Sequence, residues 1–115
     1  MIEYQWGIFR ADLEPTKGSE QAGTRPVLVI SAEEANQALP VVTVLALTSV
    51  KPGRKIYSTE ALLGATLTGL PKDSIAMAHQ IRAISKERLG QKIGSVISEE
   101  IKEQVRKAIR IYLDI

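Results

Sequence analysis

The sequence predicts one small, mainly β domain, residues 1–115, in which short strands form a strongly bent sheet or barrel with helices packed on it. Two observations lead to this class. Apolar, β-branched runs at 26–30 and 41–48 are bounded by Pro, Ser or Gly, as buried strands are. The C-terminal segment instead repeats its apolar residues at a helical spacing. With 115 residues, 44% of them hydrophobic, the chain can bury a core without disulfides.

The first half is expected to hold two strands and a helix. A strand over Tyr4–Leu13 leads into a loop, Glu14–Thr24, which is rich in Gly and polar residues. The buried strand Pro26–Ile30 follows. Ser31 stands three residues before Glu34, which is the spacing of a capping box, and this predicts a helix over 32–39 that Pro40 ends.

The second half is expected to hold further strands. Val41–Thr48 is an apolar strand that ends at the turn Lys51–Gly53. Short strands are then predicted at Tyr57–Leu63, Ser74–Gln80 and Ile81–Ser85.

A C-terminal amphipathic helix completes the predicted elements. Ser98 is a suitable N-cap, and Glu99 and Glu100 favour the positive end of the helix dipole. Basic side chains occupy the outer face. The apolar face is predicted to carry Ile101, Val105, Ala108, Ile109 and Tyr112, whose spacing places them on one side of a helix.

Composition excludes several kinds of chemistry. The chain has no cysteine, which excludes thiolate nucleophiles, Fe–S clusters and cysteine-ligated zinc. It has one histidine, His79, which excludes mechanisms that need a histidine pair. We therefore expect no metal site and no cofactor. The sequence shows neither a signal peptide nor a run long enough to span a membrane, so a cytoplasmic protein without membrane contact is expected.

The charges are divided unevenly along the chain. Residues 1–50 carry three basic and six acidic side chains, a net charge of −3, whereas residues 51–115 carry twelve and seven, a net charge of +5. A basic half is suited to a polyanion such as nucleic acid or to an acidic protein partner. The same charge distribution is also compatible with an ordinary solvated surface.

The loop and the strand after it are the most informative segment. Glu20 and Arg25 stand near the end of a Gly-containing polar loop, directly before the buried strand. Because Arg25 precedes Pro26, its backbone is restricted to extended conformations. A guanidinium offers a fixed fork of donors that suits phosphate.

This segment, Asp12–Ser31, closely resembles the MazF/PemK family of toxins from type II toxin–antitoxin systems. The family's hallmark runs Asp-Pro-Thr-x-Gly-x-Glu-Gln-x-Gly-x-Arg-Pro, and the chain follows it with Glu14 in the acidic place. The Leu47–Ser49 end of a strand and the stretch Gln80–Ile84 with Arg88-Leu89 are also similar to family elements. The resemblance covers nearly the whole chain.

The resemblance implies a fold and an activity. The implied fold is an SH3-like barrel that forms a homodimer. The implied activity is that of an mRNA interferase, an endoribonuclease that cuts single-stranded RNA at short motifs without a metal. In this chemistry the 2′-hydroxyl attacks the adjacent phosphate and leaves a cyclic phosphate and a 5′-hydroxyl. Such a reaction needs proton transfer and positive charge on the phosphorane oxygens.

The resemblance also assigns roles to residues. Arg25 would stabilise the phosphorane, Thr48 would hydrogen-bond the scissile phosphate, and Glu20 would act as a base or orient Arg25. His79 departs from the pattern, because parts of the family have an acidic residue there; it is either a proton shuttle or only a strand residue. The residues expected to contact RNA are Thr16, Lys17, Gln21, Ser49, His79, Gln80 and Arg82.

The partner implied by the resemblance is an antitoxin whose disordered acidic tail folds across the RNA site. The alternative function is a non-enzymatic, CcdB-like poison of DNA gyrase on the same fold. That activity belongs to a Trp-Gly-Ile ending, whereas this chain ends Tyr112-Leu113-Asp114-Ile115. A third alternative is a nucleic-acid-binding barrel without catalytic activity. The five aromatic residues of the chain, however, provide few side chains on which bases could stack.

Overall fold

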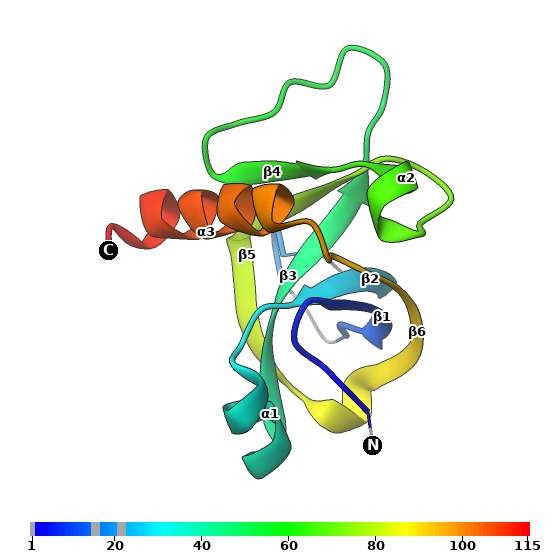
Figure 1. Cartoon of the computed structure of the whole chain (residues 1–115), viewed down its shortest axis with the longest axis vertical. Helices are drawn as coiled ribbons and strands as arrows, with labels where there is room; N and C mark the ends of the chain where they lie inside the picture. The colour runs from blue at the N-terminus through cyan, green and yellow to red at the C-terminus, as the bar shows by residue number, and fades with distance from the viewer. Residues whose placement is uncertain (1, 15–16, 21–22) are drawn as a thin grey trace.

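The computed structural model describes residues 2–14, 17–20 and 23–115, and it shows a bent antiparallel sheet with the C-terminal helix packed against one of its faces (Figure 1). The sheet has six strands in the order β4-β5-β3-β2-β1-β6. The elements are β1 (Gly7–Asp12), β2 (Thr24–Val29), α1 (Glu33–Ala38), β3 (Val41–Ser49), β4 (Glu60–Leu63), α2 (Ala65–Thr68), β5 (Ser74–Ser85), a 3₁₀ turn (Lys86–Arg88), β6 (Leu89–Ser95) and α3 (Glu99–Leu113).

This arrangement confirms the predicted fold class, mainly β with a C-terminal amphipathic helix. The edge strands β4 and β6 do not pair with each other within the described part of the chain, so the sheet does not close into a complete barrel. The bend allows both faces to be buried. One face, with Leu28, Leu45 and Leu47, packs with Ile101 and Val105 of α3, and the other face forms a second core around Val27, Val44 and Met77.

Strand β5 is one continuous strand, whereas the sequence predicted two strands that meet at residues 80 and 81. The reason for the apparent break is an irregularity in its pairing with β3. Met77 is opposite Ala46 and Arg82 is opposite Val44, so extra residues of β5 bulge between these two pairs. Such a bulge bends a strand and interrupts its alternation, which makes one strand look like two.

The helix α1 is present, but the predicted capping box is wrong. The N-cap residue is Ala32, without a side-chain cap. The Ser31 hydroxyl instead donates to Oδ1 of the buried Asn36 and accepts the Thr43 amide at 2.9 Å. Ser31 therefore connects α1 to β3 rather than starting the helix.

Glu33, and not Glu34, is the acidic residue of α1 that makes long-range contacts. Its carboxylate accepts the backbone amides of Tyr4 and Gln5, at 3.1 and 2.8 Å, and the side-chain amide of Gln37 at 2.7 Å. Burial on its own would raise the pKa of Glu33, but these hydrogen bonds outweigh it and lower the pKa from 4.5 to about 2. The carboxylate thus ties the N-terminal segment to α1.

This contact predicts an acid-dependent loss of stability. Because the pKa of Glu33 is lower in the folded chain, its stabilisation is complete above about pH 4.5 and is lost as the pH falls towards about 2. After allowance for partial exposure we expect Glu33→Gln to lower the free energy of unfolding by about 2 kcal/mol at pH 7. Urea unfolding at pH 7 and pH 2.5 measures this. A stability difference that does not shrink in acid would contradict it.

The terminal helix begins at the predicted N-cap, but Tyr112 at the end of the predicted apolar face is 45% exposed, because the helix extends past the sheet on which its first turns pack. The Ser98 hydroxyl accepts the Ile101 amide at 3.3 Å, and Ile101, Val105 and Ala108 are buried. Trp6 lies beside the Lys102 and Arg106 side chains of α3, 5.6 and 5.3 Å from its ring centre. These cation–π contacts join the N-terminal segment to the helix.

Candidate active site

Arg25 and Thr48 line one pocket, at the ends of two neighbouring strands. The pairs Val27–Ala46 and Leu28–Leu45 set the register of β2 and β3, and the same register continued by two residues places Arg25 opposite Thr48. Ser49, the last residue of β3, lines the pocket too. The structure therefore brings together three of the residues predicted from the sequence. Arg25 and Thr48 are both half-buried, which restricts their orientation.

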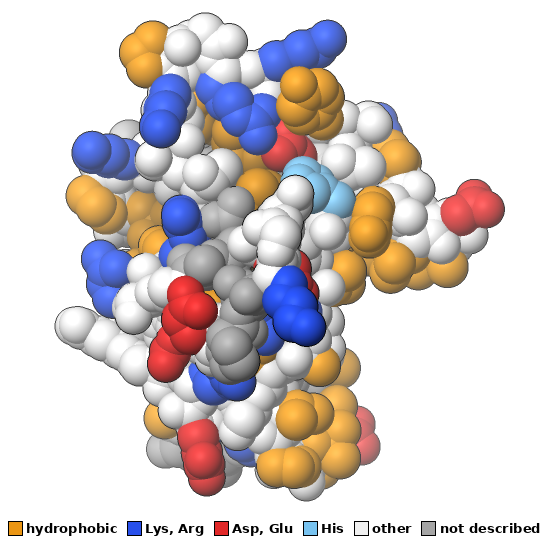
Figure 2. Space-filling model, turned by 180° about the vertical axis from the view of Figure 1, so that it is seen from behind, with side chains coloured by type: hydrophobic (Ala, Val, Ile, Leu, Met, Phe, Trp, Pro, Cys, Tyr) orange, Lys and Arg blue, Asp and Glu red, His pale blue; other side chains and the backbone are white. Residues whose placement is uncertain are grey.

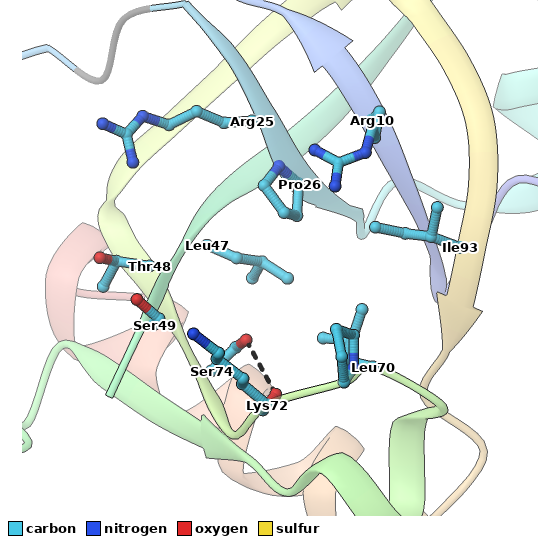
Figure 3. Close-up of a pocket in the computed structure, with 11 residues that line it drawn as sticks. Arg10, Arg25, Pro26, Leu47, Thr48, Ser49, Leu70, Lys72, Ser74 and Ile93 are labelled. Atoms are coloured by element: carbon cyan, nitrogen blue, oxygen red, sulfur yellow. Dashed lines mark hydrogen bonds between the residues drawn. The ribbon is translucent and has the colours of Figure 1, made fainter. Parts of the chain in front are cut away.

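The pocket has a volume of 260 Å³, an apolar floor and a polar rim (Figure 3). Leu47, Pro26, Leu70 and Ile93 provide apolar surface. The polar side chains that line it are Arg10, Arg25, Thr48, Ser49, Lys72 and Ser74. Within the described part of the chain it is lined by three cations and no acidic side chain, so it is suited to an anion.

Glu20 lies outside this pocket. It is exposed in the β1–β2 loop, and its carboxylate accepts the Lys17 amide at 2.5 Å, while its own amide donates to the Lys17 carbonyl at 3.1 Å. Lys17 is likewise exposed. The two residues form a local turn, so the structure does not bring Glu20 to Arg25 and Thr48. Thr16 and Gln21, predicted from the same loop, lie outside the described residues.

Gln80 and Arg82 hold the backbone of the β1–β2 loop. The Gln80 side-chain amide donates to the Ser19 carbonyl at 3.1 Å, and Arg82 donates to the Leu13 carbonyl at 3.4 Å. Arg88 donates to the Asp12 carbonyl at 3.1 Å and also to the Glu14 carbonyl. Three side chains from β5 and the turn after it thus position the loop. On the face of the molecule shown in Figure 2, Lys and Arg side chains are spread among acidic and hydrophobic ones.

His79 is exposed on β5, and its Nδ1 lies 3.3 Å from the Thr59 hydroxyl. It does not line the pocket of Arg25 and Thr48. Its neighbour Glu60 is almost fully buried and forms an ion pair of 2.7 Å with Arg54. Burial would raise the pKa of Glu60, but hydrogen bonds from Arg54 and the Tyr57 amide, and then the charges of Arg54 and His79, lower it below its usual value.

Two cations of the pocket, Arg10 and Lys72, were missed by the sequence reasoning. Arg10 pairs with Pro26 across β1 and β2, and Lys72 lies in the loop before β5. The only signal was the excess of basic residues in the second half, which does not distinguish Lys72 from its neighbours. Among the described residues, no cluster of three or more His, Asp or Glu side chains has the geometry to hold a metal ion.

Comparison with known proteins decides the family. The family model described as PemK-like, MazF-like toxin of type II toxin–antitoxin system matches residues 4–113 of the sequence. The chain belongs to this family. Two curated relatives support the assignment. The endoribonuclease MazF9 of Mycobacterium tuberculosis is 40% identical, with 94% of this chain and 93% of that protein covered. The endoribonuclease EndoA of Bacillus subtilis is 37% identical, with 98% and 96% covered. The expected enzyme class, endoribonuclease, is confirmed.

A solved structure confirms the MazF-like fold. It is the crystal structure of MazF from Deinococcus radiodurans, with a TM-score of 0.81 and 22% identity, and the match covers 100% of this chain and 99% of that one. An endoribonuclease in complex with its cognate antitoxin, from a mycobacterial species, shares the fold with a TM-score of 0.79 and 21% identity over 99% of this chain and 97% of that one. Among the described residues, no helix of this toxin is long and apolar enough to cross a membrane.

Proposed function

We propose that this toxin cuts single-stranded mRNA at short sequence motifs, without a metal, by attack of the 2′-hydroxyl on the adjacent phosphate. The products would carry a cyclic phosphate and a 5′-hydroxyl. The observation that carries the proposal is the pocket that Arg25, Thr48 and Ser49 share, with cations and no acidic side chain among its described lining residues. Negative charge that develops on a phosphorane would be stabilised there by groups already in position.

Each catalytic residue has a proposed role. The Arg25 guanidinium stabilises the charge of the phosphorane oxygens; a guanidinium offers donors and no acceptor, so it does not serve as an efficient base. The Thr48 hydroxyl donates to a phosphate oxygen. Glu20 accepts a proton or orients Arg25. Because Glu20 now accepts the Lys17 amide, this role requires the β1–β2 loop to change conformation when RNA binds.

The remaining predicted residues are proposed to bind the RNA strand. Ser49 lies at the pocket itself, and Lys17 is exposed on the loop. Gln80 and Arg82 support the loop through its carbonyls, so their contribution to RNA binding would be partly indirect. Thr16, Gln21 and the exposed His79 complete the proposed set.

The proposal is tested with a mixed-sequence single-stranded RNA incubated with the toxin in EDTA. Primer extension maps every cut and gives the motif. We expect cuts at a small number of related sequences in the presence of EDTA. An intact RNA, or cutting that appears only when Mg²⁺ is added, would contradict the proposal.

His79 is expected to be dispensable for the chemistry, because it lies outside the pocket and contacts Thr59. His79→Gln should keep the rate of cleavage and its pH profile between pH 5 and 8. Single-turnover rates across that range measure this. Loss of an acid limb with a rate lowered by roughly 100-fold would instead make His79 a proton shuttle.

We propose that the toxin acts in the cytoplasm as a homodimer, inhibited by an antitoxin with a disordered acidic tail. The apolar end of α3 supports a dimer, because a second copy of the chain would cover side chains that the single chain leaves between 44% and 80% exposed. These side chains are Ile111, Tyr112, Leu113 and Ile115. Light scattering on the purified chain tests the dimer.

The charge of the second half supports an acidic partner. Residues 51–115 carry a net charge of +5, so the antitoxin encoded beside the toxin should bind more weakly as salt rises. Titration calorimetry at low and high NaCl measures the effect, together with suppression of cleavage. An affinity that does not change with salt would indicate a mainly apolar contact.

A further inference from the structure

The pocket of Arg25 and Thr48 continues past these residues to a second cation, Arg10. In Figure 3 the Arg25 and Arg10 side chains lie on opposite sides of the pocket, with Pro26 and Leu47 between them. Arg10 is exposed, and its side chain makes no ion pair or hydrogen bond with the described residues. It is therefore an unneutralised guanidinium at the rim of a pocket.

The surface between the two arginines is apolar. Leu47 and Leu70 are buried members of the core, and Ile93 of β6 packs against the same cluster. Because Leu47 and Leu70 belong to this core and Ile93 packs against it, the floor is a packed apolar surface. A volume of 260 Å³ is at the small end of ligand pockets, which limits the occupant to one small unit rather than a long segment.

Lys72 lies on the Ser49 side of the same pocket (Figure 3). Among the described residues Lys72 forms no ion pair, and the carboxylate of the neighbouring Asp73 accepts the Ala65 amide at 2.8 Å. The end of the pocket that holds Arg25, Thr48 and Ser49 thus has a cation of its own. Arg10 can therefore bind a second anion.

We propose that Arg10 binds the phosphate next to the scissile one, so that the pocket holds a complete nucleotide between two phosphate sites. The ribose or base of that nucleotide would lie on the apolar floor formed by Pro26, Leu47, Leu70 and Ile93. This proposal rests on the function proposed above, since the first phosphate is the one at Arg25 and Thr48.

RNA fits these observations better than an acidic protein segment does. Consecutive phosphates of a strand are separated by one sugar and base, which matches two arginines separated by apolar surface. A guanidinium also matches the phosphate geometry with two parallel hydrogen bonds. Arg10 would therefore determine the register in which the strand enters the pocket.

The test is a cycle between a protein variant and a modified RNA. The RNA carries the mapped motif, with a 2′-deoxynucleotide at the cut so that it binds without reacting, and each flanking phosphate is replaced in turn by a neutral methylphosphonate. Binding is measured for the wild-type chain, Arg10→Gln and Arg10→Lys. Lys107→Gln is the matched control, since Lys107 is an exposed cation of α3 outside this pocket.

We expect Arg10→Gln to weaken binding about 10-fold and to reduce the slope of log Kd against log salt by about 0.7. One methylphosphonate should weaken wild-type binding equally and leave Arg10→Gln unaffected, while Arg10→Lys should lie between. Lys107→Gln should bind as the wild type does. Thermal unfolding checks that each variant is folded.

The proposal fails if Arg10→Gln binds RNA as tightly as the wild type, or if every methylphosphonate weakens both proteins equally. It also fails if Arg10→Gln loses affinity only for the acidic antitoxin. Failure of the proposed function is a separate result: the wild-type chain would then leave the unmodified RNA uncut.

Discussion

Arg25→Ala is expected to lower the rate of RNA cleavage by roughly 100-fold or more while leaving the fold intact. The half-buried Arg25 is the second residue of β2, directly before Pro26, and lines the pocket that it shares with Thr48. Its positive charge matters most when the phosphate gains charge in the transition state, so the loss should appear mainly in kcat. Single-turnover cleavage of an RNA with the mapped motif measures it.

Arg25→Lys separates charge from geometry. It keeps the positive charge but loses the planar fork, so its rate should lie between those of the wild type and the alanine variant. Unfolding curves that match the wild type would exclude misfolding as the cause. A normal cleavage rate in Arg25→Ala would remove Arg25 from the catalytic site.

Thr48→Val should lower the rate by roughly 10-fold or more, because it removes one hydroxyl from a β-branched side chain of nearly the same shape. Thr48 is half-buried near the end of β3 and opposite Ile75, so the strand should be preserved. The same assay measures the effect, with KM determined separately.

Thr43→Val is the matched control, since Thr43 is half-buried on the same strand but does not line the pocket. It should cleave RNA at the wild-type rate. If both Thr43→Val and Thr48→Val lower the cleavage rate equally, the effect comes from a disturbance of strand β3 and not from the loss of a hydroxyl in the pocket. Full activity of Thr48→Val would leave Thr48 with a structural role only.

The elements that could be predicted from the sequence are those whose signal is local. Helix α3 has its cap at Ser98 and its apolar spacing within one segment, and both agree with the structure. The strands β2 and β3 are continuous apolar runs, which favour buried strands whatever their partners.

The short helix α2 was missed although its ends at Gly64 and Gly69 are local, whereas strand β6 and the role of Ser31 depend on distant residues. Strand β6 contains Gly90, Gly94 and Lys92, and its strand character comes from pairing with β1 rather than from alternation. The capping box failed for the same reason: the Ser31 hydroxyl found partners in Thr43 and Asn36, which local spacing does not reveal.

The site divides in a similar way. Arg25 was identified from the loop motif and Thr48 from the resemblance of the Leu47–Ser49 strand end to a family element, and the register of β2 and β3 brings the two together. Arg10 could not be identified, because only the fold places its strand beside Pro26. Gln80 and Arg82 were expected at the RNA, yet in this structure they hold carbonyls of the β1–β2 loop, contacts that span more than sixty positions of sequence.

The most direct test of the central claim removes a single oxygen atom, that of the attacking 2′-hydroxyl, from the substrate. An RNA with one mapped motif is compared with the same strand in which only the nucleotide that supplies the 2′-hydroxyl is 2′-deoxy, both in EDTA. We predict that the first is cut to a cyclic phosphate and a 5′-hydroxyl, seen by mass spectrometry, and that the second binds but stays intact. Cleavage of the deoxy-substituted strand, or a product with a 5′-phosphate, would contradict attack by the 2′-hydroxyl at the Arg25 and Thr48 pocket.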